Sequence, residues 1–157
     1  MDSKSLKSGF HLIGEVELKY IERATGKILA VFRGRNTVVD TGLDRFTRLA
    51  GGDSSTNFTH LAIGTGTTAV QSTDTELETE VAREAATITY PANGQVKFNK
   101  LFTFGSGESY SISEVGVFDN AIASGSTMLN RMIQSPAKDV DADIDLDVSI
   151  TITAQRP

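Results

Sequence analysis

A strict alternation of apolar and polar residues near the C-terminus constrains the fold more than any other feature of the sequence. From Val140 to Ala154, every second residue is apolar, and the residues between are acidic or small and polar. Side chains on a β-strand point alternately to its two faces, so this spacing predicts a strand with one buried face. Its other face is expected to carry five aspartates, at positions 139, 141, 143, 145 and 147.

Similar strand signals recur along the chain, separated by turn residues. Val16–Tyr20 alternates, and Ile28–Phe32 follows after a turn that contains Gly26, which predicts a β-hairpin. About eight short strands are expected in all. Besides the hairpin and the C-terminal strand they include Asn36–Val39, Ala86–Tyr90, Gln95–Phe104, Tyr110–Phe118 and Thr127–Ile133, with turns at Pro91–Gly94 and at Pro136.

One short helix is predicted among the strands. Asp40 and Thr41 are residue types that cap helices, and apolar residues at helical spacing follow until Gly51. Strands without regular helical crossovers are typical of antiparallel folds. We therefore predict a mainly β fold, an antiparallel β-sandwich or jelly-roll-like barrel with one short α-helix near residues 42–50. The 157 residues are expected to form a flexible N-terminal arm over residues 1–9 and a single β-rich domain over residues 10–157.

Charge and composition argue against several classes of function. The net charge is −5 and the isoelectric point is about 5.0, which is unfavourable for binding nucleic acid. The chain has no cysteine, so disulfides and thiolate metal ligands are excluded. No apolar run approaches the roughly 18 residues that a membrane helix requires. The sequence therefore predicts no nucleic-acid partner, no membrane partner and no cofactor.

The stretch His60–Arg83 is compatible with either a phosphate-binding loop or a structural corner. Gly64 and Gly66 form a lone Gly-x-Gly after an apolar strand, but no Lys-Ser or Lys-Thr pair follows them. Residues 75–78 resemble a helix capping box with few apolar residues behind it, which fits a short helix or an irregular segment equally well. We interpret the whole stretch as a corner that leads into a long connection.

The aspartate run provides weak candidates for a cation site, namely Asp141, Asp143 and Asp145. Counted from Asp139, the sixth and twelfth residues are Ile144 and Ile150, whereas an EF-hand loop needs Gly and Glu there. Alternate carboxylates on a strand also lie about 6.6–6.8 Å apart, too far to share one ion easily. A solvated strand face is the favoured interpretation, and an acidic surface that binds a basic partner is the second.

Glu114 lies among apolar residues of a predicted strand, so its carboxylate must be paired or solvated. Arg83 and Arg131 are the candidate partners for a structural ion pair. The two histidines have no zinc-like spacing, and Gly-x-Ser-x-Gly is absent. We therefore expect no catalytic residues and no enzymatic activity.

The order of several short motifs resembles that of small structural proteins of tailed bacteriophages. The motifs span roughly residues 36–153 and are NTVVDTGLDRFTRLAGG, FTHLAIGTGTTAVQSTDTELETEVARE, SISEVGVFD and TMLNRMIQSPAKD, followed by the alternating C-terminal stretch. The resemblance implies a non-enzymatic, β-rich protein located in the virion, and it brings no catalytic or binding residues with it.

Within that class, a capsid-surface decoration or cement protein is the first expectation, since the chain has no long repetitive shaft. A tail, collar or fibre-attachment component is the second, and a host-glycan-binding module is the third. Tyr90 and Tyr110, which could serve glycan binding, are expected in the core. The partners would be other virion proteins and further copies of this chain, with a trimer as the expected oligomer. Lys4, Lys7, Arg33 and Arg35 are candidates for assembly contacts.

Overall fold

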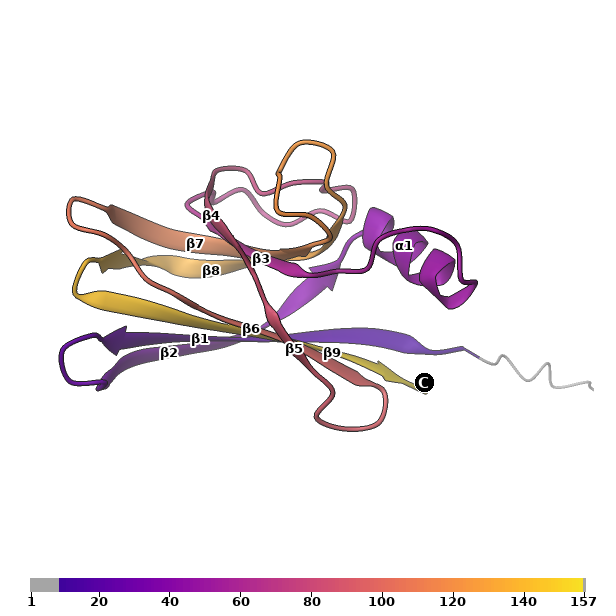
Figure 1. Ribbon diagram of the computed structural model, residues 1–157, viewed down its shortest axis with the longest axis horizontal. Helices are drawn as coiled ribbons and strands as arrows, with labels where there is room; N and C mark the ends of the chain where they lie inside the picture. The colour runs from indigo at the N-terminus through magenta and orange to yellow at the C-terminus, as the bar shows by residue number, and fades with distance from the viewer. Residues whose placement is uncertain (1–8, 157) are drawn as a thin grey trace, which may run out of the picture.

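The computed structural model describes residues 9–156, which form nine β-strands and one α-helix (Figure 1). The elements in chain order are β1 (His11–Glu22), β2 (Ile28–Val38), α1 (Asp40–Ala50), β3 (His60–Gly64), β4 (Glu80–Ala85), β5 (Thr87–Thr89), β6 (Gln95–Phe102), β7 (Ser109–Phe118), β8 (Met128–Asp141) and β9 (Ile144–Gln155). No helix among the described residues has the length and apolar character needed to cross a membrane.

All strands belong to one antiparallel sheet, in the order β4-β3-β7-β8-β2-β1-β9-β6-β5. The sheet folds over into two layers (Figure 1). Layer A contains β1, β9, β6, β5 and most of β2, and layer B contains β8, β7, β3 and β4. β2 crosses between them, because its residues 28–36 pair with β1 and its Thr37 and Val38 pair with β8.

The two outer edges of the sheet also lie near each other, so the sheet is nearly closed into a barrel. β4 and β5 are the two outermost strands, yet only Ala86 separates them in the chain. The backbone N–H of Ala86 donates to Thr59 O at 2.9 Å, so the chain stays attached to layer B as it passes to layer A. The predicted mainly β fold, a β-sandwich or barrel-like sheet with one short helix, is confirmed.

The main core fills the space between the layers, as the alternation in the sequence predicts. β1 contributes Val16, Leu18 and Tyr20, β9 contributes Leu146 through Ile152 at every second position, and layer B contributes Leu61, Ile63, Val115 and Val117. A second, smaller cluster lies on the outer face of layer B and consists of Val39, Ala62, Leu77, Phe118 and Met128. The connection between β3 and β4 covers this outer face.

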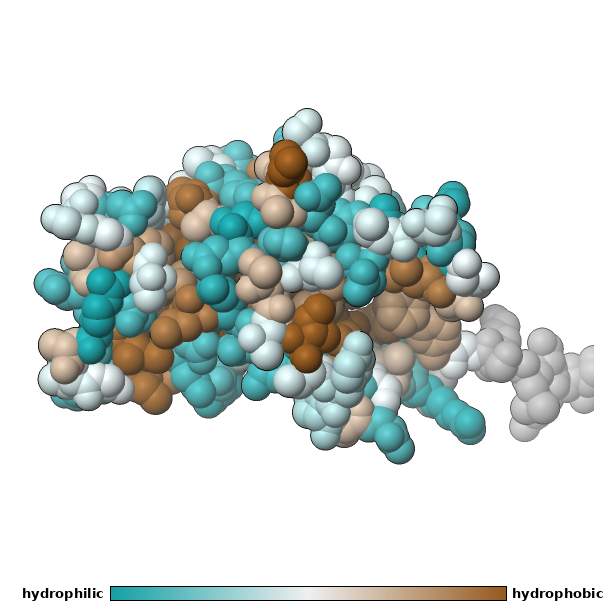
Figure 2. All heavy atoms as spheres, viewed as in Figure 1, coloured by the Kyte–Doolittle hydropathy of each residue, from teal (hydrophilic) through white to brown (hydrophobic). Residues whose placement is uncertain are grey.

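Eight large hydrophobic side chains of the described residues remain exposed: Phe10, Ile28, Leu29, Val31, Leu43, Tyr90, Leu101 and Ile122. Figure 2 shows hydrophobic surface at the left end of the molecule, over the part of β1 and β2 near their connecting turn. Three of the eight, Ile28, Leu29 and Val31, lie in four consecutive residues of β2.

The structure corrects the predicted C-terminal strand. Residues 140–154 do not form one strand, because Ala142 and Asp143 form a turn that joins β8 to β9. The N–H of Asp143 donates to Asp141 Oδ1 at 2.9 Å and stabilises this turn. A short Asx turn keeps the alternating spacing of its flanks, so the pattern alone could not reveal it.

Other predicted boundaries also change. Pro136 lies inside β8 instead of at a turn, and the predicted strand Asn36–Val39 is the end of β2. Residues 75–78 form no helix. The N-cap of α1 is Val39, without a side-chain cap, so Asp40 and Thr41 lie inside the helix. The predicted arm, apart from Gly9, lies outside the described residues.

Candidate functional site

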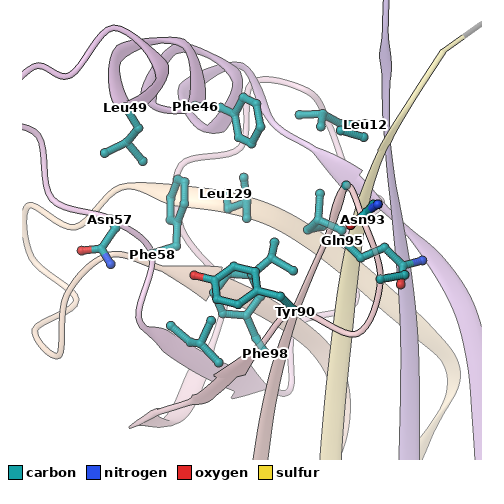
Figure 3. A pocket seen from close by; sticks show the side chains of 16 residues that line it. Leu12, Phe46, Leu49, Asn57, Phe58, Tyr90, Asn93, Gln95, Phe98 and Leu129 are labelled. Carbon is teal, nitrogen blue, oxygen red and sulfur yellow. The ribbon is translucent and has the colours of Figure 1, made fainter.

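An apolar cleft opens at one end of the barrel, between α1 and the hairpin that joins β5 to β6 (Figure 3). Its volume is about 550 Å³, a size common among ligand sites. None of its lining residues carries a formal charge, and they are Leu12, Phe46, Leu49, Asn57, Phe58, Ile88, Tyr90, Ala92, Asn93, Gly94, Gln95, Val96, Phe98, Leu129, Ile152 and Ala154. The cleft therefore suits an uncharged, largely apolar group.

The cleft exists because apolar side chains of both layers continue to this end of the barrel. Leu12, Phe98 and Ile152 come from the inner face of layer A, and Leu129 comes from layer B. Helix α1 lies above the ends of the layer A strands in Figure 1 and turns its half-buried Phe46 toward them (Figure 3). The space between the helix and the strands is left unfilled.

Hydrogen bonds and one close contact fix the position of α1. The N–H of Val39 donates to Leu129 O at 3.0 Å. Arg45 Nη1 lies 2.5 Å from Asp119 Oδ2 and donates to Thr56 O at 2.7 Å. Gly42 is buried against β8, and a Cβ atom there would lie 2.3 Å from Leu129 O. Only glycine lets the helix approach β8 this closely.

The rim of the cleft carries an exposed tyrosine and several amides, which corrects one prediction. Tyr90 was expected in the core, but it is 77% exposed and lines the cleft, as does Asn93 of the same hairpin. Asn57 lies across the opening in Figure 3. Tyr110 is half-buried, and its ring centroid lies 6.0 Å from that of Phe104.

Apolar surface continues from the cleft toward the start of β1. Phe10 is 59% exposed, and its ring centroid lies 6.3 Å from that of Phe46 in the cleft. The two assembly candidates Lys4 and Lys7 lie outside the described residues.

A second site lies on the outer face of layer B, where Glu114 is completely buried and fully hydrogen-bonded. Its Oε1 accepts the backbone N–H groups of Gly66 at 3.0 Å and Thr79 at 2.7 Å. Its Oε2 accepts the N–H of Glu78 at 3.0 Å, and Arg131 Nε and Nη2 at 3.0 and 2.9 Å. Five donors on one carboxylate hold both ends of the β3–β4 connection against β7.

The Gly-Thr-Gly sequence is part of this carboxylate site. A Cβ atom on Gly64 or Gly66 would lie 2.5 or 2.6 Å from Glu114 Oε1, so side chains at these positions would overlap the carboxylate. The N–H of Gly66 donates to Glu114, the role that a phosphate oxygen would take in a nucleotide site. The glycines therefore allow a structural corner to close over a buried acid.

Arg131, and not Arg83, is the partner of Glu114. Arg131 Nη1 also donates to Asp74 Oδ2 at 2.9 Å. Burial acts to lower the pKa of the Arg131 guanidinium, but its hydrogen bonds and charge contacts with Asp74 and Glu114 outweigh burial and raise that pKa above its ordinary value. The arginine stays charged, as the pairing requires.

Arg83 forms a separate ion pair two strands away. Its Nη2 lies 2.7 Å from Glu80 Oε2, and its guanidinium carbon lies 3.8 Å above the centre of the Phe118 ring. Its Nη1 donates to Asn120 O at 3.0 Å and to Ser126 Oγ at 2.9 Å. Arg83 thus attaches the β7–β8 loop to the outer face of layer B.

Arg33 and Arg35 lie on the outer face of layer A, beside a shallow polar depression of about 490 Å³. Arg33 Nε lies 2.7 Å from Glu17 Oε2. Lys97 and Thr151 line the same depression. The two arginines are accessible, as an assembly role would need, and at least one has its charge balanced within the chain.

Two of the three aspartates proposed as weak cation ligands are engaged in other contacts. Asp145 Oδ1 lies 2.6 Å from Arg23 Nη2, and Asp141 accepts the N–H of Asp143 in the β8–β9 turn. No group of three acidic or histidine side chains among residues 9–156 is arranged to hold a metal ion.

The cleft was not predicted from the sequence, because its lining comes from separate segments that only the fold brings together. The sequence feature that pointed toward the cleft was the apolar side of the predicted helix, which includes Phe46 and Leu49. Comparison with known proteins adds no assignment: no protein-family model matches the chain, and no curated protein or solved structure gives a significant match.

Proposed function

We propose that the protein is a non-enzymatic structural protein of a tailed bacteriophage virion, and that it decorates the capsid surface. The uncharged cleft supports this role. Its lining contains no acid, base or nucleophile pair of the kind that catalysis uses, and it offers an open apolar surface to a partner. The proposal of a virion protein rests on the order of the motifs over residues 36–153, which resembles that of structural proteins of tailed bacteriophages.

The proposed occupant of the cleft is an uncharged segment of the major capsid protein with two or three large apolar side chains. The absence of charge in the lining disfavours a charged occupant, because its desolvation would not be compensated. A cleft of this size holds only part of a stable interface, which typically buries about 1,200–2,000 Å². The exposed Phe10 beside the cleft would supply further contact.

Two matched variants test this proposal. Ala92 lies at the cleft and is exposed, so Ala92→Arg places a charged side chain in the opening without disturbing the core. Ala121 in the β7–β8 loop is also exposed and does not line the cleft, so Ala121→Arg is the control. We expect occupancy on undecorated heads to fall at least tenfold for Ala92→Arg and to stay unchanged for Ala121→Arg.

Equal occupancy of the two variants would reject the cleft as the docking site. If the wild-type protein fails to bind heads but binds purified tails, the head assignment is wrong and a tail, collar or fibre-attachment role replaces it.

Exposed Tyr90 favours one alternative function, the binding of a neutral host glycan. An exposed aromatic ring offers a face for a sugar ring, and the amides of Asn93 and Asn57, which line the same cleft, offer hydrogen bonds for its hydroxyls. If this alternative holds, neutral oligosaccharides bind the wild-type protein and Tyr90→Phe, while Tyr90→Ala loses binding. Retained binding by Tyr90→Ala would exclude this tyrosine as the platform.

A further inference from the structure

The part of β2 in layer A has a strand on one side only. β1 pairs with residues 28–36 of β2, but β8 pairs with β2 only at Thr37 and Val38. Among the strand pairs of residues 9–156, none lies on the other side of residues 30–36. We call residues 30–36 the free edge of β2. Every second residue of such an edge has backbone N–H and C=O groups without a ladder partner.

The free edge lacks two features that usually prevent strand pairing, namely shortness and a proline. The outermost strands β4 and β5 are only six and three residues long, which is one common protection. The free edge has seven residues and contains no proline and no lysine. Val31 on its outer face is 41% exposed. A register shift opposite Tyr20 and Ile21 makes Leu29 an extra, bulged residue, so regular pairing begins at Ala30.

We propose that the free edge of β2 pairs with the same edge of a second copy of this chain, antiparallel and centred on Phe32. The pairing would join the two A layers into one continuous sheet with two-fold symmetry. This inference rests on the strand edge and does not depend on the virion role or on the cleft.

The inner-face side chains fit a pair centred on Phe32. In this register Phe32 lies opposite Phe32 of the second copy, and Ala30 lies opposite Gly34. The Phe32 ring leans over its own Gly34, where a Cβ atom would lie 3.0 Å from the ring. The small residues on both sides of Phe32 leave space for two rings that meet at the two-fold axis.

The outer-face side chains distinguish this register from its neighbours. Centring on Phe32 places Val31 opposite Arg33, whose Nε is already bound to Glu17 at 2.7 Å. Centring on Arg33 would place two arginines directly opposite each other, which is unfavourable. Centring on Val31 would bring the bulged Leu29 into the paired region. The Phe32 register avoids both problems over residues 30–34.

The geometry favours a dimer over the trimer expected from the sequence. One strand edge can form a ladder with only one other strand, and an edge that pairs with itself closes the assembly at two copies. The paired segment is short, so we expect the free dimer to be weak and to form at high protein concentration.

Cysteine cross-linking tests both the contact and its register. Because the natural chain has no cysteine, a Val31→Cys chain can be mixed with an Arg33→Cys chain and oxidised mildly. Directly opposed residues have Cβ atoms about 4.5–5.5 Å apart, close to disulfide geometry. We expect mixed 31–33 dimers to exceed 31–31 and 33–33 dimers several-fold, as measured by mass spectrometry.

Leu101→Cys provides the matched control, because Leu101 is 45% exposed and lies on β6, away from the free edge. Cross-linking no faster than that of this control would overturn the proposal, and so would a predominance of 31–31 dimers. Circular dichroism of each variant establishes that it is folded, which the exposure of Val31 and Arg33 favours.

A pair of charge variants gives an independent test with opposite signs. In the proposed dimer, Val31→Glu would face Arg33 of the second copy twice, and Val31→Lys would form two like-charge pairs. We expect sedimentation equilibrium to show several-fold tighter dimers for Val31→Glu and several-fold weaker ones for Val31→Lys. Weaker association in both variants would exclude this register. It would instead indicate a pair centred on Val31, in which residue 31 lies opposite itself and either charge repels its copy.

Discussion

Arg131 and Glu114 form a buried ion pair in which two guanidinium nitrogens, Nε and Nη2, lie 3.0 and 2.9 Å from the same carboxylate oxygen. The Arg131 side chain is 3% exposed and that of Glu114 is completely buried. Removing one member of such a pair leaves the other charged and buried, which destabilises the protein more than replacing both members by apolar residues would.

We therefore expect Glu114→Ala to lower the free energy of unfolding by about 3–5 kcal/mol. The loss also frees the N–H groups of Gly66, Glu78 and Thr79, so the β3–β4 connection should become the first part to exchange its amide hydrogens. Thermal unfolding and hydrogen exchange measure the two effects. An unchanged melting curve would contradict the structural role of the pair.

Gly42 within α1 and Gly51 at its C-cap should respond differently to alanine. A Cβ on Gly42 would overlap Leu129 O at 2.3 Å, whereas a Cβ on Gly51 would meet its nearest atom at 3.5 Å. Gly42→Ala should cost about 1–3 kcal/mol through overpacking. Gly51→Ala, at φ −80°, should be neutral or slightly stabilising. Chemical denaturation of the two variants makes the comparison, and equal costs would argue against the close approach.

Tyr20 should make the protein sensitive to alkaline pH. Burial raises the pKa of its hydroxyl from 10.0 to about 12, although its hydrogen bond to Gln134 acts in the opposite direction. Between these two values the unfolded chain loses the proton and the folded chain keeps it. The contribution of Tyr20 to the free energy of unfolding is therefore fully present below pH 10 and is lost as the pH rises through about 12.

The variant Tyr20→Phe checks this expectation. It should be less stable at neutral pH by about 1–2 kcal/mol, because Gln134 loses the donor that lies 2.7 Å away. Its stability should then fall less steeply than that of the wild type between pH 10 and 12, the window of the Tyr20 shift. Parallel alkaline slopes for the two proteins would show that another group controls this range.

Acid should loosen the attachment of α1. Burial acts to raise the pKa of Asp119, but the N–H of Thr127 and the side chains of Arg45 and Thr56 outweigh it, so this pKa lies below its ordinary value of 3.8. The stability from Asp119 is therefore present above pH 3.8 and is lost as the pH falls through the lower folded-state value.

Asp119→Asn should remove this acid dependence and cost about 1–3 kcal/mol at neutral pH, because Arg45 loses its charged partner. Urea unfolding at pH 6 and pH 3 would measure both effects. A variant that loses as much stability on acidification as the wild type would show that Asp119 is not the responsible group. Asp44→Asn is the control, since its pair with Arg48 is exposed.

The strands were predictable because burial on one face imposes a two-residue period. That period accounts for the inner faces of β1 and β9, where Val16, Leu18, Val148 and Ile150 are all buried. It does not report where a strand ends if the turn preserves the spacing, which is why Ala142 and Asp143 were assigned to a strand.

The ion pair was only half-predictable, since sequence alone offered Arg83 and Arg131 as equal partners. Sheet register decides between them. Arg131 lies on β8, which pairs directly with the strand that carries Glu114, β7, and it is aligned there with Gly116. Arg83 lies on β4, which pairs with β3 and is therefore one strand further from Glu114. Strand order depends on contacts between distant segments, which no local pattern encodes.

The cleft and exposed Tyr90 were missed for a related reason. Tyr90 follows a three-residue strand, too short for alternation to show which way its side chain points. Whether an apolar residue is covered depends on the element above it, and α1 covers this end of layer A only partly.

The pairing of β1 with β9 along twelve residues brings together strands from near the two ends of the described chain. During synthesis, β1 emerges from the ribosome long before its partner exists. Until β9 arrives, the edge of β1 that pairs with β9 has no neighbouring strand. The domain should therefore fold only after most of the chain has been made, and the newly synthesised hairpin is the segment that a chaperone would be expected to bind.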